Sequence, residues 1–424
     1  MKVLLISANT EQLTMAVMPL GLACVSAAVA KAGHDVAMLD LMFETNAGAI
    51  LKKAIAEFQP ECIGISVRNI DDQNFESPEF LLDKVKEVVS ICRNLCDAPI
   101  VLGGAGYSIF PESTLRYLEA DLGIVCEGEI AFPALLSRLE NGHDLSGVPG
   151  LYIRNRGLQR PGEFAGKLDE LALPEPGILS VSSAKNKQLW IPVQTRRGCP
   201  FKCSYCSTPV IEGTIIRKRS PHIVTDWIEK WVKAGCEKFF FVDNTFNLPP
   251  AYAKKICRSI MERNLDISWS CILYPKNVDR ELVELMAAAG CRHVSLGFES
   301  GSAQILKSLN KRFLPEDVRT ISTLLSDYDI DRMGFLLLGT PGETKNTVEE
   351  SLSFVDSLQL DALKITAGVR IYPNTQLAEI AEKQGVIASQ KTLLQPRFYL
   401  ARGLEGWLPE RLKEWTASHP YVVK

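Results

Sequence analysis

The chain has 424 residues, a formal net charge of −3 and 46% hydrophobic residues. This length exceeds that of one typical domain, so we expect two or three domains. A nearly neutral balance without a dense run of Lys and Arg excludes a basic surface for long nucleic acid. The longest apolar stretch, around residues 15–30, is interrupted by Pro19 and is too short for a membrane-spanning helix.

The cysteines and the amino terminus bear on location. The twelve cysteines are scattered and lie mostly in apolar surroundings, as for Cys62 and Cys291. Such a distribution is typical of reduced, buried thiols and not of a disulfide framework. The apolar run at residues 1–8 is too short for a signal peptide. We therefore expect a cytoplasmic protein with no membrane span.

Residues 1–142 alternate short apolar strands with helices. Continuous apolar strands separated by amphipathic helices are typical of a doubly wound, Rossmann-like parallel sheet. A ligand on such a sheet binds at the carboxyl ends of the strands. The expected strands are 3–8, 35–40, 62–67, 100–102 and 122–125, and the expected helices are 20–32, 47–58, 78–95 and one from residue 130.

A second strand and helix series occupies residues 189–385, after a segment rich in Pro and Gly at 143–188 that we interpret as a linker. Six strands indicate an incomplete (β/α)6 barrel, in which chemistry is carried by the loops after the strands. Residues 386–424 form a tail of undefined role. The expected strands are 189–195, 238–242, 267–273, 293–298, 333–338 and 363–369, with helices at 222–234, 251–263, 280–289, 315–326 and 345–358.

Three cysteines share the loop after the first of these strands. Cys199, Cys203 and Cys206 have the spacing C-x-x-x-C-x-x-C and no fourth partner nearby. A structural zinc site has four ligands, usually in two separated pairs. Three thiolates suit a [4Fe–4S] cluster in which one iron has no protein ligand. The alternative is three reduced cysteines that are neighbours by chance.

The stretch from Arg197 to Cys206 resembles the signature of the radical S-adenosylmethionine (SAM) enzymes. Tyr205 lies where that superfamily usually has an aromatic residue before the last cysteine. The resemblance implies a partial (β/α)6 radical SAM barrel. It also implies that Cys199 and its two companions hold a [4Fe–4S] cluster whose free iron binds SAM.

Further motifs follow later strands, at Asp243-Asn244, Gly297-Phe-Glu299 and residues 334–344. They resemble those of radical SAM enzymes that carry an N-terminal cobalamin-binding domain. The family's usual Gly-Gly-Glu is absent, and Asp243-Asn244 stands in its place. A carboxylate can bind the ammonium or ribose of SAM, although Glu299 could instead cap the next helix. The SAM-binding residues that the resemblance implies are Tyr205, Asp243, Gly297, Glu299, Leu336 and Gly339.

The first domain resembles the cobalamin-binding domain of the same group. A glycine-rich turn alone could equally hold a nucleotide. The chain lacks the Asp-x-His-x-x-Gly motif whose histidine binds cobalt, and His34 lies at the opposite edge of the sheet from a ligand. Cobalamin would therefore lack a histidine ligand from the protein. The cobalamin-binding residues that the resemblance implies are Pro19, Gly21, Ser66, Arg68, Asn69, Gly103, Gly104, Gly106, Glu127 and Gly128.

The resemblance implies a cobalamin-dependent radical SAM methyltransferase that uses a 5′-deoxyadenosyl radical and methylcobalamin. Its target would be an unactivated carbon, or a phosphinate phosphorus, of a small molecule or lipid. The alternative is a non-methylating rearrangement, cyclisation or ring contraction. An electron donor such as flavodoxin or ferredoxin is the implied partner. The sequence identifies neither the substrate nor a catalytic residue.

A methylthiotransferase is disfavoured. Such an enzyme should carry the cysteines of a second cluster in its N-terminal domain. The five cysteines of this domain are expected within helices or strands, unlike a cluster site: Cys24, Cys62, Cys92, Cys96 and Cys126.

Overall fold

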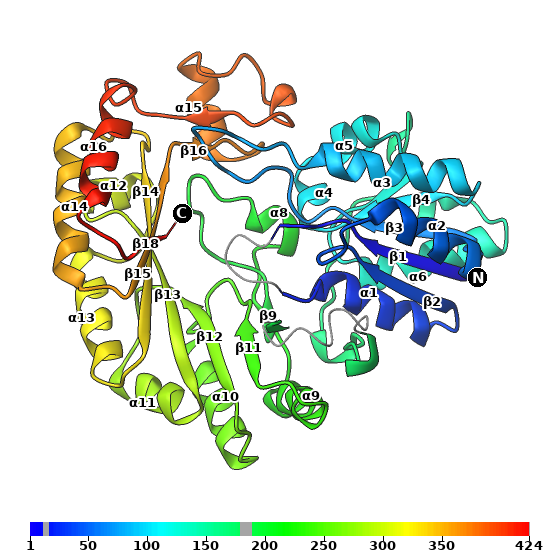
Figure 1. Ribbon diagram of the computed structural model, residues 1–424, viewed down its shortest axis with the longest axis horizontal. Helices are drawn as coiled ribbons and strands as arrows, with labels where there is room; N and C mark the ends of the chain where they lie inside the picture. Colours follow the sequence, from blue (N-terminus) through cyan, green and yellow to red (C-terminus); the bar gives the residue numbers. More distant parts are fainter. Residues whose placement is uncertain (12–16, 179–188, 424) are drawn as a thin grey trace.

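The computed structural model describes residues 1–11, 17–178 and 189–423. Two α/β units lie side by side, and each is built around a sheet of seven strands (Figure 1). No helix in the described part of the chain is both long and apolar enough to cross a bilayer.

The first sheet is doubly wound, as expected. Its strand order is β2-β1-β3-β4-β5-β6-β7, and the first five of these strands are parallel. Helices α1 and α6 pack together on one face, and α2, α3 and α5 cover the other. The elements are β1 (Lys2–Ser7), α1 (Leu20–Lys31), β2 (Asp35–Asp40), α2 (Ala47–Phe58), β3 (Cys62–Ser66), α3 (Leu82–Leu95), β4 (Ile100–Gly103), α4 (Ala105–Ile109), α5 (Pro111–Leu118), β5 (Leu122–Ile124), α6 (Gly128–Glu140), β6 (Leu151–Ile153) and β7 (Gly157–Leu158).

Two expectations for this unit are wrong. The segment after residue 142 is not wholly irregular, because β6 and β7 add an antiparallel hairpin to the edge of the sheet. Helix α3 begins at Leu82 instead of residue 78, because Phe80 forms a bridge with Asp71 and keeps the chain extended there. The last part of the expected linker, 179–188, lies outside the described residues.

The second sheet is parallel, and its strands β8 to β15 are neighbours in chain order. The six expected strands are present, and the tail adds a short seventh, β18 (Val422–Val423), beside β15. The elements are β8 (Ile191–Val193), α9 (Pro221–Lys233), β11 (Lys238–Phe241), α10 (Pro250–Glu262), β12 (Ser268–Leu273), α11 (Arg280–Ala288), β13 (Cys291–Glu299), α12 (Ala303–Ser308), α13 (Pro315–Ser326), β14 (Asp331–Leu338), α14 (Lys345–Leu358), β15 (Ala362–Ala367) and α16 (Trp407–Ala417).

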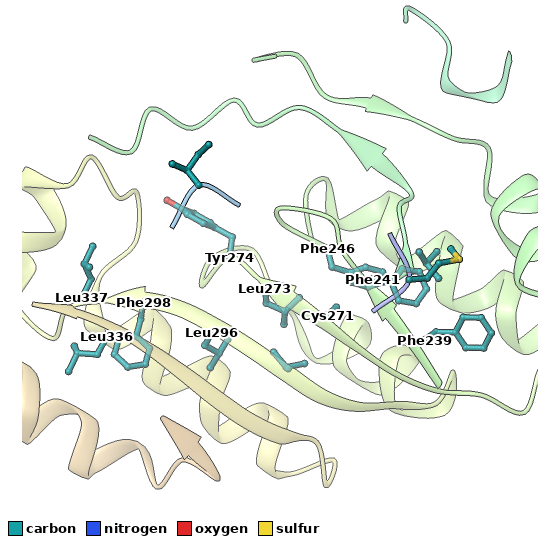
Figure 2. Close-up of a cluster of buried hydrophobic side chains, with 14 of the residues drawn as sticks. Phe239, Phe241, Phe246, Cys271, Leu273, Tyr274, Leu296, Phe298, Leu336 and Leu337 are labelled. Atoms are coloured by element: carbon teal, nitrogen blue, oxygen red, sulfur yellow. The ribbon is translucent and has the colours of Figure 1, made fainter. Parts of the chain in front are cut away.

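The core of this open barrel lies between its strands and the surrounding helices. Figure 2 shows Phe239, Phe241 and Phe246 at one end of this core. The ring of Trp269 packs edge-on against Phe241, with ring centroids 4.9 Å apart. Dense apolar packing of this kind resists deformation, so the strand ends that carry the site residues have a rigid base.

The loop after β3 reaches from the first unit to the barrel. Asp71 on this loop forms an ion pair with Arg370 of β16 (Val369–Arg370), with Oδ2 and Nε 2.7 Å apart. Both side chains are buried. Phe75 on the same loop packs edge-on against Phe398, with centroids 5.8 Å apart. The two units are therefore joined by specific buried contacts.

Candidate functional site

The cysteine loop runs from β9 (Arg196–Arg197) to α8 (Thr208–Glu212). Gly198 has a φ of +91°, and a Cβ there would collide with the carbonyl oxygen of Ile215, so only glycine suits this position. The amide of Cys199 donates to Gly213 O at 3.1 Å, and the amide of Ser204 donates to Leu309 O at 3.2 Å. The loop is thus held by backbone contacts from two directions.

The three thiols of the loop lie close enough to influence one another. Burial raises the pKa of Cys199 to about 11, with the nearby Cys206 and Cys203 adding to the rise. Burial also raises the pKa of Cys203, while Lys311 acts to lower it. Iron binds the thiolate form of cysteine. The positive charge of bound iron would therefore favour the thiolates, which burial alone disfavours.

Among the described residues, no three His, Cys, Asp or Glu side chains gather as ligands of one metal ion do. A cubane differs from a single metal ion in that it binds each of its cysteines through a different iron. The ligands of a cubane therefore stay farther apart than those of one zinc ion. The donor set of Cys199, Cys203 and Cys206 fits a [4Fe–4S] cluster.

Glu299 and Lys311 form an ion pair beside the cysteine loop. Lys311 Nζ lies 3.1 Å from Glu299 Oε1, and the two side chains are 6% and 15% exposed. The same Nζ lies 5.4 Å from the centre of the Tyr205 ring. Burial acts to lower the pKa of Lys311, but Glu299 and Tyr205 outweigh it and hold that pKa well above its ordinary value. Lys311 was missed in the sequence, where only its place after the short helix α12 could have marked it.

Glu299 also has an unusual backbone. Its φ is +64°, in the left-handed region that side chains other than glycine rarely adopt. Such residues gather at functional sites and are held by their surroundings. A Cβ at Gly297 would lie 3.2 Å from Glu299 Oε1, so the missing side chain leaves the carboxylate its place.

Leu336 and Gly339 are two expected SAM-binding residues on or next to β14, the strand beside Glu299. They could offer main-chain atoms to a ligand. Leu336 of β14 pairs in register with Glu299, yet its side chain is 1% exposed and lies in the core beside Phe298 (Figure 2). Gly339 follows the same strand with a φ of +91°. A ligand here could contact the main chain of Leu336, and the assignment of Leu336 and Gly339 to the SAM site stays a prediction.

Asp243 does not face the site. Its Oδ1 accepts hydrogen bonds from the amides of Thr195 and Arg196, at 2.8 and 3.1 Å. Its Oδ2 accepts from Thr195 Oγ1 at 2.6 Å and from Arg196 Nε at 3.2 Å. The carboxylate is fully buried. Four donors from its own chain therefore occupy Asp243, and the structure gives it the task of fixing β8 to β11.

A cavity of about 330 Å³ opens at the carboxyl ends of the first sheet. It lies on the face that α1 and α6 cover, and its wall includes Gln194, Arg197 and Glu212 of the second unit. Gly21 in this wall has no atom within 4 Å of a built Cβ, so a side chain there would enter free space. The wall contains eight residues expected to bind cobalamin: Pro19, Gly21, Ser66, Arg68, Gly103, Gly104, Glu127 and Gly128.

Two other expected residues do not line this cavity. Asn69 lies outside it, and its Nδ2 is 3.4 Å from Asn9 Oδ1. A Cβ at Gly106 would lie 2.9 Å from Arg68 O, so this glycine is required by the close approach of the chain to itself. Gly104 lines the cavity but has the same constraint, because its Cβ would lie 2.7 Å from Val67 O.

No histidine lines the cavity among the described residues. His34 lies at the start of β2, and its Nδ1 is 3.2 Å from the amino group of Met1. Strand β2 begins at the edge of the sheet opposite the cavity. The expectation that His34 is structural agrees with this position.

Sequence models of two families match the chain. The model described as the radical SAM superfamily covers residues 193–355, and the model of the B12 binding domain covers residues 6–136. The chain therefore carries a radical SAM domain preceded by a B12-binding domain. The B12-binding domain matches the first unit of the fold, and the radical SAM domain matches the second.

Relatives with curated names match most of the chain. A protein named as an uncharacterized methyltransferase from Pyrococcus horikoshii is 29% identical, over 90% of this chain and 83% of its own length. Tryptophan 2-C-methyltransferase from Streptomyces laurentii is 25% identical, over 89% and 74%. Cytidylyl-2-hydroxyethylphosphonate methyltransferase from Streptomyces wedmorensis is 24% identical, over 88% and 80%.

Solved structures share the whole fold. The radical SAM methyltransferase TsrM from Kitasatospora setae, with tryptophan and a SAM analog bound, has a TM-score of 0.87 and 24% identity. The match covers 99% of this chain and 90% of that one. The cobalamin-dependent radical enzyme OxsB has a TM-score of 0.79 and 19% identity, over 98% of this chain and 67% of that one. At these identities the likeness concerns the fold.

Proposed function

We propose that this radical SAM enzyme is a cobalamin-dependent methyltransferase acting on a carbon or phosphorus atom of a small molecule or lipid. One observation carries the proposal. The cavity of the B12-binding domain and the cysteine loop share a wall, because Arg197 and Glu212 flank the loop and also line the cavity. A group in the cavity would therefore lie beside the cluster.

The names of the relatives support methyl transfer. The tryptophan enzyme is named for methylation at a carbon atom, and the other named Streptomyces relative for a cytidylyl phosphonate. Both substrates in these names are small molecules with an anionic group. We propose a substrate of similar size for this chain.

We propose that the cavity takes part of cobalamin. Its volume of about 330 Å³ is at the lower end of the range for small-molecule sites, so it is too small for the whole cofactor. We propose that the wall around Gly21, Gly103 and Gly128 holds this part. When bound, cobalamin carries the methyl group, and the cluster supplies an electron to SAM.

The remaining roles belong to residues of the chain. Cys199, Cys203 and Cys206 would hold the cluster as thiolates. Glu299 and Lys311 present one negative and one positive group beside it, which matches the ammonium and carboxylate of the methionyl part of SAM. The main chain at Gly297 and Gly339 would face the nucleoside, while Glu299 Oε1 and Leu400 occupy the space that a Cβ would take at these two glycines.

Three further expectations stay proposals. Flavodoxin or ferredoxin is the proposed electron donor. The cytoplasm is the proposed compartment, and the twelve free cysteines support it. The proposed domains are residues 1–142, a linker at 143–188, the barrel at 189–385 and a tail at 386–424, although β6 and β7 continue the first sheet to Leu158.

Non-methylating chemistry is the alternative. An anaerobic magnesium-protoporphyrin IX monomethyl ester cyclase from Rubrivivax gelatinosus is 28% identical, over 75% of this chain and 58% of its own length. A methylthiotransferase has less support, because Cys24 and Cys62 are buried in separate elements.

Anaerobic reconstitution tests the proposal. The chain is loaded with iron, sulfide and hydroxocobalamin, then incubated with SAM, a reductant and candidate acceptors such as tryptophan. Methyl transfer yields S-adenosylhomocysteine and a product heavier by one methyl group. 5′-Deoxyadenosine with no methylated product in any acceptor would favour the cyclase-like alternative.

A further inference from the structure

A buried cluster of charges connects the cysteine loop with the cavity. Arg197, which precedes Cys199 by two residues, donates through Nη2 to Glu129 Oε1, and its Nη1 lies 3.2 Å from Glu127 Oε1. Its Nε donates to Gln194 Oε1 at 2.7 Å. The side chains of the arginine and its two carboxylates are at most 8% exposed. Such contacts are strong because little water competes for them.

The two carboxylates belong to the first unit. Glu127 is the N-cap of α6 and Glu129 lies in its first turn, where the helix dipole favours negative charge. Glu127 Oε2 also accepts a hydrogen bond from the amide of Ala165 at 2.6 Å. Burial acts to raise the pKa of Glu129, but Arg197 outweighs it and holds that pKa below its ordinary value. Both carboxylates are therefore held in place, and Arg197 favours the charged form of Glu129.

The other end of the cysteine loop has a similar link. Glu212, at the end of α8, accepts hydrogen bonds from the amide of Gly198 at 3.2 Å and from Gln194 Nε2 at 3.0 Å. Asn244 Nδ2 donates to the same carboxylate at 2.6 Å. Glu212 and Arg197 both line the cavity. The cavity wall thus includes a side chain from each end of the loop that would carry the cluster.

We propose that Arg197 is a positioning residue that couples the cluster site to the cobalamin site. A group that fills the cavity packs against the Arg197–Glu127–Glu129 arrangement and so favours the conformation that holds Cys199 in place. A cluster on the loop favours the same arrangement from the other side. Because coupling between two sites is reciprocal, each group should tighten the binding of the other by the same factor. This inference rests on the proposed function, because it takes cobalamin as the ligand of the cavity.

The guanidinium of Arg197 is suited to this task in a way that lysine is not. Its planar fork contacts two carboxylates and Gln194 at once, whereas an ammonium group is a compact point charge. Arg197→Lys therefore keeps the buried positive charge while removing the fixed geometry. A second variant, Arg197→Gln with Glu129→Gln, removes this pair of charges together should the first variant fold poorly. Glu127 then keeps Arg217 as its partner, with Oε1 and Nη1 2.5 Å apart.

The experiment measures hydroxocobalamin affinity without turnover. Absorbance titrations compare the full chain carrying the cluster with the full chain in which Cys199, Cys203 and Cys206 are alanine. We expect the cluster to strengthen binding about tenfold, a common size for coupling between sites. In Arg197→Lys this ratio should fall to about one, within roughly twofold, while both groups still bind. The spectrum of the reduced cluster, recorded with and without cobalamin, should change in the wild type and stay constant in the variant.

Arg370→Lys is the matched control, because Arg370 forms a different buried ion pair between the units and does not line the cavity. It should keep the tenfold ratio. A ratio of one in the wild type, or an unchanged ratio in both Arg197 variants, would overturn the inference. Absence of cobalamin binding in every form would overturn the proposed function as well. Coupled binding without methyl transfer would overturn the proposed function alone.

Discussion

Lys311 Nζ lies 3.1 Å from Glu299 Oε1, so a residue of a loop pairs with the last residue of a barrel strand. Glu299 ends β13, and Lys311 follows α12. The pair lies next to Cys203. One carboxylate and one ammonium group are therefore placed beside the cysteine loop. This relationship leads to the first prediction.

Glu299→Gln should weaken SAM binding by about ten- to a hundredfold, because it removes a charge-assisted contact from a poorly hydrated site. The measurement is equilibrium binding of SAM to the cluster-loaded chain. Asp361→Asn is a suitable control, since Asp361 pairs with Arg332 at 3.1 Å near the opposite ends of the strands. Unchanged affinity in a folded Glu299→Gln protein would leave Glu299 with a structural role only.

Asp243→Asn should lower the stability of the fold and leave the affinity for SAM nearly unchanged, which is the reverse of the effect of Glu299→Gln. Removing one partner of a buried ion pair leaves the other uncompensated and costs about 3–5 kcal/mol. We expect the free energy of unfolding to fall by about this amount while SAM affinity changes less than about twofold. Urea denaturation and SAM binding, measured on the same preparation, separate the two effects. A large loss of affinity with normal stability would return Asp243 to the SAM site.

Replacing Cys199, Cys203 and Cys206 together by alanine should remove about four irons per chain and the broad thiolate-to-iron absorbance, as expected for a cubane. Iron analysis after anaerobic reconstitution is the measurement. Cys236→Ala is the control, because Cys236 follows α9 and lies apart from the cysteine loop. A triple variant that keeps its iron would exclude this site.

Gly21→Leu should block cobalamin without unfolding the chain. A built Cβ at Gly21 meets no atom within 4 Å, and the residue lines the cavity, so the leucine side chain would occupy the free space. The affinity for hydroxocobalamin should fall at least about tenfold, since close-packed sites tolerate little added volume. Gly406→Leu is the control, because Gly406 also has open space around it but lies at the start of α16. Gly104→Val would be less informative, because it would collide with the backbone of Val67.

Stability should decrease as the pH rises from about 4.5 to about 7 because of one buried carboxyl. Burial raises the pKa of Glu343 from 4.5 to about 7, against hydrogen bonds from the amides of Thr340 and Gly339. The folded chain then binds a proton that the unfolded chain has lost, so stability is greatest below pH 4.5 for this group and is lost by pH 7. The change is about 3 kcal/mol at most. Urea denaturation of wild type and Glu343→Gln at several pH values should show this slope only in the wild type.

The cysteine loop and most of the cavity wall could be predicted because each depends on local sequence. A glycine-rich turn after a parallel strand lies at the carboxyl edge wherever the strand falls in the sheet. Asp243 was expected to bind SAM from its position after β11, which is also local, whereas its partners Thr195 and Arg196 follow the neighbouring strand β8. Lys311 has no motif of its own. Its importance follows from a contact with Glu299, which only the folded chain defines.

The buried contacts between the units have a consequence for assembly. Arg197 joins the barrel to the first unit beside the cysteine loop, through Glu129. The Asp71–Arg370 pair joins the two units at a second place. Moving the units apart would break both pairs at a large cost in free energy. A corrinoid would therefore enter and leave the assembled chain slowly, because both steps need room between the paired units. We expect titrations of the folded chain with hydroxocobalamin to reach equilibrium only after long incubation.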